Sequence, residues 1–159
     1  MKIIFLDIDG VLNSASSCLA LGGYPQARSY PGGGHWELFD PIACAILRKI
    51  VGTTGANCVL SSTWRSMGAV YVAQLAQHLR VPIVGVTRCD KGDEPRGEQI
   101  DDWLVEHPEV SRYIIIDDNS DMLPHQEEFF VHVNGAYGLG YDHFIKSVRL
   151  LGENNEVNC

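Results

Sequence analysis

The stretch IIFLDIDGVLN, residues 3–13, decides the fold of this chain. It begins with an uninterrupted apolar run, which is typical of a strand that is buried on both faces of a parallel sheet. Asp7 and Asp9 follow two positions apart, and Gly10 comes directly after them. Two carboxylates at the end of a buried strand repel each other unless something holds them together. The rest of the sequence indicates which group holds these two carboxylates together.

The size and composition predict one globular domain with no affinity for membranes. The chain has 159 residues, of which 45% are hydrophobic and 20% are charged, and its formal net charge is −8. This charge disfavours tight binding to duplex nucleic acid and to anionic membranes. No apolar run reaches the roughly 18 residues that a transmembrane helix needs. The opening MKIIFLDIDG does not resemble a signal peptide, so we expect a cytoplasmic protein.

Apolar β-rich runs alternate with helical patterns along the chain. Strands are predicted at residues 2–8, 56–62, 82–87, 112–117 and 128–133, and helices at 40–51, 67–80, 96–107 and 141–151. This alternation predicts an α/β fold: a single doubly wound, Rossmann-like domain of about five parallel strands with helices on both faces.

The predicted domain spans residues 1–152 and leaves a polar tail at 153–159. Residues 14–39 are rich in Ser, Gly and Pro, and we interpret them as an inserted flap or ordered loop. The segment is too short for a separate cap domain, so the domain is expected to be capless or to carry a small flap.

Charged and hydroxyl side chains gather where the predicted strands end. These residues are Asp7 and Asp9 after the first strand, Ser61, Ser62, Thr63 and Arg65 after the second, and Asp117, Asp118, Asn119 and Asp121 after the fourth, with Arg96 at the start of the preceding helix. The carboxyl ends of parallel strands meet at one edge of a sheet, where ligands bind. Four carboxylates there require a cation, and Mg²⁺ prefers such oxygen ligands. The predicted metal set is Asp7, Asp9, Asp117 and Asp118.

Four motifs resemble, in order, those of the haloacid dehalogenase (HAD) superfamily of aspartate-nucleophile phosphatases. They are FLDIDGVLN, VLSSTWR, RGEQI at a helix start, and IIIDDNSD. Together they cover nearly the whole chain except the flap and the tail. The wording of the last three motifs is also similar to the phosphatase-like domain in bacterial RNA-repair proteins.

The resemblance assigns a role to each motif residue. It implies that Asp7 is the nucleophile, that Asp9 is the acid and base and gives Mg²⁺ its backbone carbonyl, and that Asp118, with Asp117, holds the metal. Ser62, or Ser61 in its place, would donate to a phosphate oxygen. Arg96 stands where the family usually has Lys, keeps the positive charge and offers a bidentate fork. The expected substrate-binding residues are Gly10, Ser61 and Arg65, although Arg65 is nearly as well interpreted as a plain surface charge.

The sequence therefore predicts a Mg²⁺-dependent phosphomonoester hydrolase that acts through an aspartyl-phosphate. Its substrate is expected to be a small molecule such as a nucleotide, a nucleic-acid end or a protein, with a local basic rim at Arg28, Arg65, Arg88, Lys91 and Arg96. One alternative is a catalytically silent binding module with the same fold. A second is a signalling receiver, which would carry its phosphorylated aspartate after the third strand, where this chain has only PIVGVT.

Overall fold

The computed structural model describes residues 1–23, 39–88 and 94–152, and it confirms the predicted α/β fold. Five strands form one sheet: β1 (Lys2–Leu6), β2 (Asn57–Leu60), β3 (Ile83–Val86), β4 (Arg112–Asp117) and β5 (Phe130–His132). They lie in the order β3-β2-β1-β4-β5, and every neighbouring pair is parallel. Strand β1 is therefore central, and its carboxyl end lies between the ends of β2 and β4.

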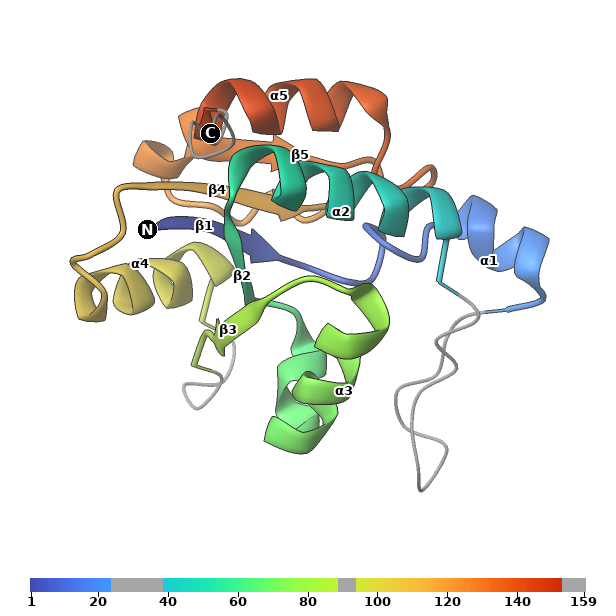
Figure 1. Cartoon of the computed structure of the whole chain (residues 1–159), viewed down its shortest axis with the longest axis horizontal. Helices are drawn as coiled ribbons and strands as arrows, with labels where there is room; N and C mark the ends of the chain where they lie inside the picture. The colour runs from blue at the N-terminus through green and yellow to red at the C-terminus, as the bar shows by residue number, and fades with distance from the viewer. Residues whose placement is uncertain (24–38, 89–93, 153–159) are drawn as a thin grey trace, which may run out of the picture.

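Helices cover both faces of this sheet (Figure 1). They are α1 (Ala15–Leu21), α2 (Pro41–Thr54), α3 (Ala69–Leu79), α4 (Arg96–Glu106) and α5 (Tyr141–Leu151), together with the short 3-10 helices η2 (Thr63–Met67) and η3 (Pro124–Phe129). Among the described residues, no helix has the length and apolar character needed to cross a bilayer.

Side chains of β1 alternate between two hydrophobic cores. Ile4 and Leu6 pack with buried residues of α2, α3 and α5. Ile3 and Phe5 face the other way and pack with Ile100 and Trp103 of α4. Because successive side chains of a strand point to opposite faces, this alternation continues past the strand and directs Asp7 to the α4 face.

Most predicted elements differ from the structure by one to three residues at their ends, and β1 ends at Leu6 rather than at residue 8. Three differences are local and have a clear cause. Residues 15–21 form helix α1 rather than loop, because the Ser14 hydroxyl accepts from the Ser17 N–H and Gly22 closes the helix in the left-handed conformation. Residues 24–38 of the predicted flap and residues 153–159 of the predicted tail lie outside the described residues. The helix predicted at 67–80 begins at Ala69, and the strand predicted at 128–133 begins at Phe130, because 3-10 helices occupy the preceding residues.

Replacing Phe5 should reveal how much the α4 face contributes to stability. The side chain is fully buried and makes edge-to-face contacts with Trp103 and Tyr113 at centroid distances of 5.4 and 5.9 Å. We expect Phe5→Ala to lower the free energy of unfolding by roughly 3–5 kcal/mol, measured by urea denaturation. Val105→Ala on the exposed side of α4 is the matched control, and an equal loss in both variants would contradict this packing.

Candidate active site

A pocket opens at the carboxyl ends of the strands, where the predicted motifs meet. Its volume is about 400 Å³, and it is lined by Asp7, Asp9, Gly10, Thr63, Arg96, Asp118, Asn119 and Gly135. The predicted residues Asp7, Asp9, Gly10, Arg96 and Asp118 are thus brought together. Asp117 lies directly beneath them, at the end of β4, and is fully buried.

Arg96 joins the two central strands through their acidic ends. Its Nη1 lies 2.7 Å from Asp7 Oδ1 and 2.7 Å from Asp117 Oδ2. Asp7 and Asp117 share the α4 face because each lies two positions after a residue of that core, Phe5 and Ile115 respectively. Burial works against the charged guanidinium, but the carboxylates of Asp7 and Asp117 outweigh it and raise the pKa of Arg96.

The backbone of Arg96 is fixed as firmly as its side chain. Its N–H donates to Asp121 Oδ2 at 3.0 Å, and the next N–H, of Gly97, donates to the Asp121 carbonyl at 3.2 Å. A side chain at position 97 would collide with the backbone of Leu123. The start of α4 is therefore held against the loop that follows β4, which keeps the guanidinium between its two acids.

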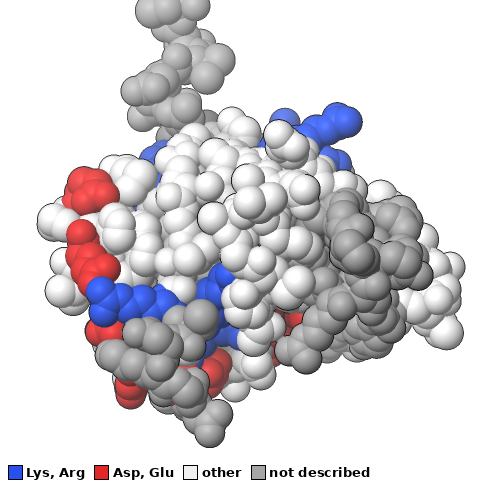
Figure 2. Space-filling model, turned by 90° about the horizontal axis from the view of Figure 1, so that it is seen from below, with Lys and Arg blue, Asp and Glu red and all other residues white. Residues whose placement is uncertain are grey.

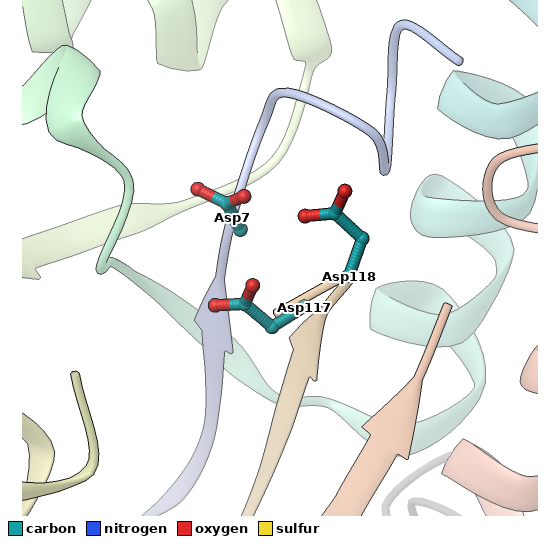
Figure 3. A group of neighbouring side chains, drawn as sticks. All are labelled: Asp7, Asp117 and Asp118. Atoms are coloured by element: carbon teal, nitrogen blue, oxygen red, sulfur yellow. The ribbon is translucent and has the colours of Figure 1, made fainter. Parts of the chain in front are cut away.

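Three carboxylates gather beside this arginine, and Figure 3 shows them pointing toward one another from the ends of β1 and β4. Asp7, Asp117 and Asp118 each offer one oxygen, and these oxygens lie within 4.8 Å of one another. Burial and the neighbouring Asp7 raise the pKa of Asp117 to about 7, and the same two causes raise the pKa of Asp118. A single guanidinium does not offset so much negative charge.

The donor set fits a magnesium ion. Mg²⁺ favours hard oxygen ligands and binds through one or two carboxylates while keeping several waters, and this group supplies carboxylates beside an open pocket. Asp9 was also predicted as a metal ligand. Among the described residues, however, its carboxylate is not part of this group of three. Its backbone carbonyl is the atom that the resemblance assigned to the metal.

Two glycines make room for the Asp118 carboxylate. Gly10 has a φ of +76°, and a Cβ built on it would collide with the Asp118 carboxylate. A Cβ on Gly135 would meet the same carboxylate oxygen. Gly10 was predicted from its place after Asp9. Gly135 was missed, because it lies in the loop after β5 and only the folded chain brings that loop to the site.

The sequence matches a known protein family. A family model described as the HAD domain in Swiss Army Knife RNA repair proteins matches residues 3–144. The chain belongs to this family. No curated protein and no solved structure matches it.

Membership in the HAD family confirms the resemblance predicted from the four motifs. It supports a phosphoryl-transfer function of the HAD type, and the family generally uses Mg²⁺, which agrees with the carboxylate group at the site. At the end of β3, where a receiver would carry its phosphorylated aspartate, this HAD domain has Thr87.

The Asp9 carboxylate has two partners that the sequence did not reveal. Asn13 Nδ2 donates to its Oδ1 at 2.6 Å, and Trp64 Nε1 donates to its Oδ2 at 2.8 Å. Asn13 is four residues away and fully buried, whereas Trp64 comes from η2, 55 residues away. From sequence alone, Trp64 is expected to be a core residue, so no sequence signal indicated that its N–H also binds Asp9.

The two serines of the second motif point in different directions. Ser62 lies two positions after Leu60, which packs in the core beneath α2, and its hydroxyl accepts from the Trp64 N–H at 3.5 Å as the cap of η2. Ser61 lies two positions after Val59, which packs in the core beneath α4, so its side chain shares the face of Asp7 on the neighbouring strand. The Ser61 hydroxyl is fully buried and has no hydrogen-bond partner among the described residues.

Arg65 is turned inward. Its guanidinium donates to the carbonyls of Ser61 and Arg88 and to Gln99 Oε1 of α4. The interpretation of Arg65 as a plain surface charge is wrong, since only 9% of the residue is exposed. These hydrogen bonds link the end of β2 to Gln99 of α4, which lies three residues after Arg96. Of the other basic residues predicted for a rim, Arg88 pairs with Glu106, and Arg28 and Lys91 lie outside the described residues.

Without a bound metal, the contribution of Asp117 to stability should fall as the pH rises. In the folded, metal-free protein the pKa of Asp117 is raised to about 7, above its ordinary value of 3.8, so the folded state binds more protons than the unfolded state between these values. The contribution of Asp117 to stability is therefore fully present below about pH 4 and is lost as the pH rises through about 7.

The measurement is urea denaturation in EDTA at pH 5 and pH 8, for the wild type and Asp117→Asn. We expect the wild type to lose up to a few kcal/mol relative to the variant between these pH values, and saturating Mg²⁺ to restore most of the loss at pH 8. Parallel pH profiles for the two proteins would contradict the raised pKa.

Proposed function

We propose that this chain is a Mg²⁺-dependent phosphomonoester hydrolase that acts through an aspartyl-phosphate on Asp7. The observation that carries the proposal is the Arg96 guanidinium, which lies 2.7 Å from both Asp7 and Asp117 beside an open, carboxylate-lined pocket. A cation in this place orients the nucleophile and offsets the charge of a phosphoryl group, and such positioning with electrostatic stabilisation is the main source of catalysis in phosphoryl transfer.

The proposed reaction has two steps, which are formation of the aspartyl-phosphate and its hydrolysis. In the first, an Asp7 oxygen attacks phosphorus, the bond to the ester oxygen breaks, and the departing oxygen takes its electron pair together with the Asp9 proton. In the second, water attacks the aspartyl-phosphate and gives its proton to Asp9, the bond to Asp7 breaks, and inorganic phosphate leaves. Both residues are then ready for another turnover.

Mg²⁺ would be held by Asp7 and Asp118, with the Asp9 carbonyl as a further ligand. Asp117 is already engaged by Arg96 and by the Asn119 N–H, which donates to its Oδ1 at 2.9 Å. When bound, the ion would neutralise part of the charge on the phosphoryl oxygens. The raised pKa values of Asp117 and Asp118 are supporting evidence, because they reflect charge that the protein alone does not balance.

Ser61 is the better-supported phosphate donor of the two serines. The sequence pattern favoured Ser62, but that hydroxyl caps η2 and lies on the face opposite to Asp7. Ser61 lies on the Asp7 face with its hydroxyl unpartnered among the described residues, which suits a donor that meets its acceptor only when phosphate is bound.

The proposed substrate is a phosphate on a nucleotide or on a nucleic-acid end. The HAD domains that this chain is similar to are described as belonging to RNA repair proteins. Tight binding to duplex nucleic acid is not expected. On the described part of the face drawn in Figure 2, Lys and Arg side chains form one elongated group at the lower left and a separate group at the upper right, with acidic side chains beside the first. No membrane partner is proposed, and the cytoplasm remains the expected location.

The decisive test is hydrolysis of p-nitrophenyl phosphate with and without Mg²⁺. We expect Mg²⁺-dependent turnover that falls by at least about 10³-fold in Asp7→Asn, because the amide cannot form the phospho-intermediate. Asp142→Asn removes one carboxylate from the exposed start of α5 and is the matched control. A screen of nucleotides and of 3′- and 5′-phosphorylated oligonucleotides then identifies the substrate.

Two outcomes would overturn this proposal. Activity that persists unchanged in Asp7→Asn would exclude Asp7 as the nucleophile. A folded, Mg²⁺-binding protein that hydrolyses neither the aryl phosphate nor any oligonucleotide would favour the alternative of a silent binding module.

The two serines can be separated by paired substitutions. We expect Ser61→Ala to lower kcat/KM by about tenfold or more, since one hydrogen bond to a charged group is lost. Ser62→Ala should instead lower the free energy of unfolding by about 1 kcal/mol through the lost cap and leave kcat/KM nearly unchanged. The reverse pattern would return the role to Ser62.

A further inference from the structure

The Asp9 carboxylate accepts a hydrogen bond at each of its two oxygens. Asn13 Nδ2 lies 2.6 Å from Oδ1, and Trp64 Nε1 lies 2.8 Å from Oδ2. We call this pair of donors the Asp9 clamp. Asp9 itself is solvent-exposed and lines the pocket, so a carboxylate there would sample several rotamers if nothing held it.

Each arm of the clamp is fixed by its own surroundings. Asn13 is fully buried, and its Oδ1 accepts from the Gly10 N–H at 3.0 Å, which leaves Nδ2 directed at Asp9. The Trp64 ring is 5% exposed and lies between Phe39 and Tyr71, at centroid distances of 5.3 and 6.1 Å. Neither donor can follow a moving carboxylate without disturbing packed neighbours.

The two arms approach from different parts of the chain. Asn13 belongs to the turn after β1, in the same loop as Asp9, and Trp64 belongs to η2 after β2. A carboxylate accepts about four hydrogen bonds, so these two donors do not occupy all of its acceptor sites. Asp9 also affects Tyr71, which packs against Trp64. Burial is the larger cause and the negative charge of Asp9 the smaller one, and together they raise the pKa of Tyr71 to about 12.

We propose that Trp64 and Asn13 are positioning residues that aim the Asp9 carboxyl group at the leaving oxygen of the substrate. The inference rests on the proposed phosphatase function, because only then does Asp9 transfer a proton. Proton transfer requires the acid within hydrogen-bond reach of the departing oxygen, and the clamp fixes that geometry before substrate arrives. Neither residue is among those that line the pocket.

A comparison of leaving groups tests this role. An alkoxide needs a proton as it departs, whereas p-nitrophenolate is stable without one, so loss of the acid's position should affect only the first. We expect Trp64→Phe, which keeps the ring and removes the N–H, to lower kcat/KM for ethyl phosphate about tenfold to a hundredfold. The same variant should change kcat/KM for p-nitrophenyl phosphate by less than about threefold, because packing is kept. The parameter kcat/KM reports the steps from substrate binding to release of the alcohol or phenol, so it excludes the later hydrolysis of the aspartyl-phosphate.

Two further variants sharpen the comparison. Asn13→Asp keeps the acceptor for the Gly10 N–H and replaces the donor with negative charge, so it should show the same selective loss of kcat/KM on ethyl phosphate. Trp103→Phe removes an indole N–H from the α4 core, away from the pocket, and should leave the ratio of the two substrates unchanged. An equal loss on both substrates in Trp64→Phe would overturn the proposal and leave Trp64 with a structural role.

The contact itself can be read without turnover. In ¹⁵N NMR spectra, the indole N–H resonance of Trp64, assigned by its absence in Trp64→Phe, should move in Asp9→Ala by more than the resonance of Trp103. An unmoved resonance would overturn the clamp in any case. A wild-type protein that hydrolyses neither substrate would instead sink the proposed function, and with it the catalytic role of the clamp, even where the resonance moves.

Discussion

The placement of Arg96 between Asp7 and Asp117 is the interaction on which the rest of the site depends. Two carboxylates at the ends of neighbouring strands are tolerated because one guanidinium lies 2.7 Å from each. The three side chains are nearly buried, with exposures of 12% for Arg96, 7% for Asp7 and none for Asp117. Charges in such a position interact strongly and are costly to leave unpaired, so truncating Arg96 would destabilise the fold as well as the site.

The compensation is incomplete, and this gives the site its chemistry. A third carboxylate, Asp118, joins the two that Arg96 contacts, and the pKa values of Asp117 and Asp118 are raised. The same excess negative charge that weakens the metal-free fold favours a divalent cation. Glycines at positions 10 and 135 bring the backbone close enough to enclose Asp118 without closing the pocket. This excess charge lowers the stability of the metal-free fold and suits the divalent cation that the proposed function requires.

Much of the fold and part of the site could be predicted from local sequence. Alternating apolar runs and helical patterns give the strands of a parallel sheet, and the carboxyl-end rule then places Asp7, Arg96 and Asp118 at one edge. The prediction failed where short polar segments were concerned. Helix α1 depends on the Ser14 cap and on contacts of its first N–H groups with the Gly135 and Ala136 carbonyls, which no local pattern reveals.

The sequence by itself determined the order of the elements, the family and the acidic and basic residues of the four motifs, because each follows from residue type and spacing along a strand or helix. Only the tertiary structure decided how the side chains are used. It placed Trp64 against Asp9, turned Arg65 inward to Gln99, and set Ser61 rather than Ser62 on the Asp7 face. These outcomes depend on contacts between segments that are far apart in the chain and on the one-residue register that assigns a side chain to one face of the sheet.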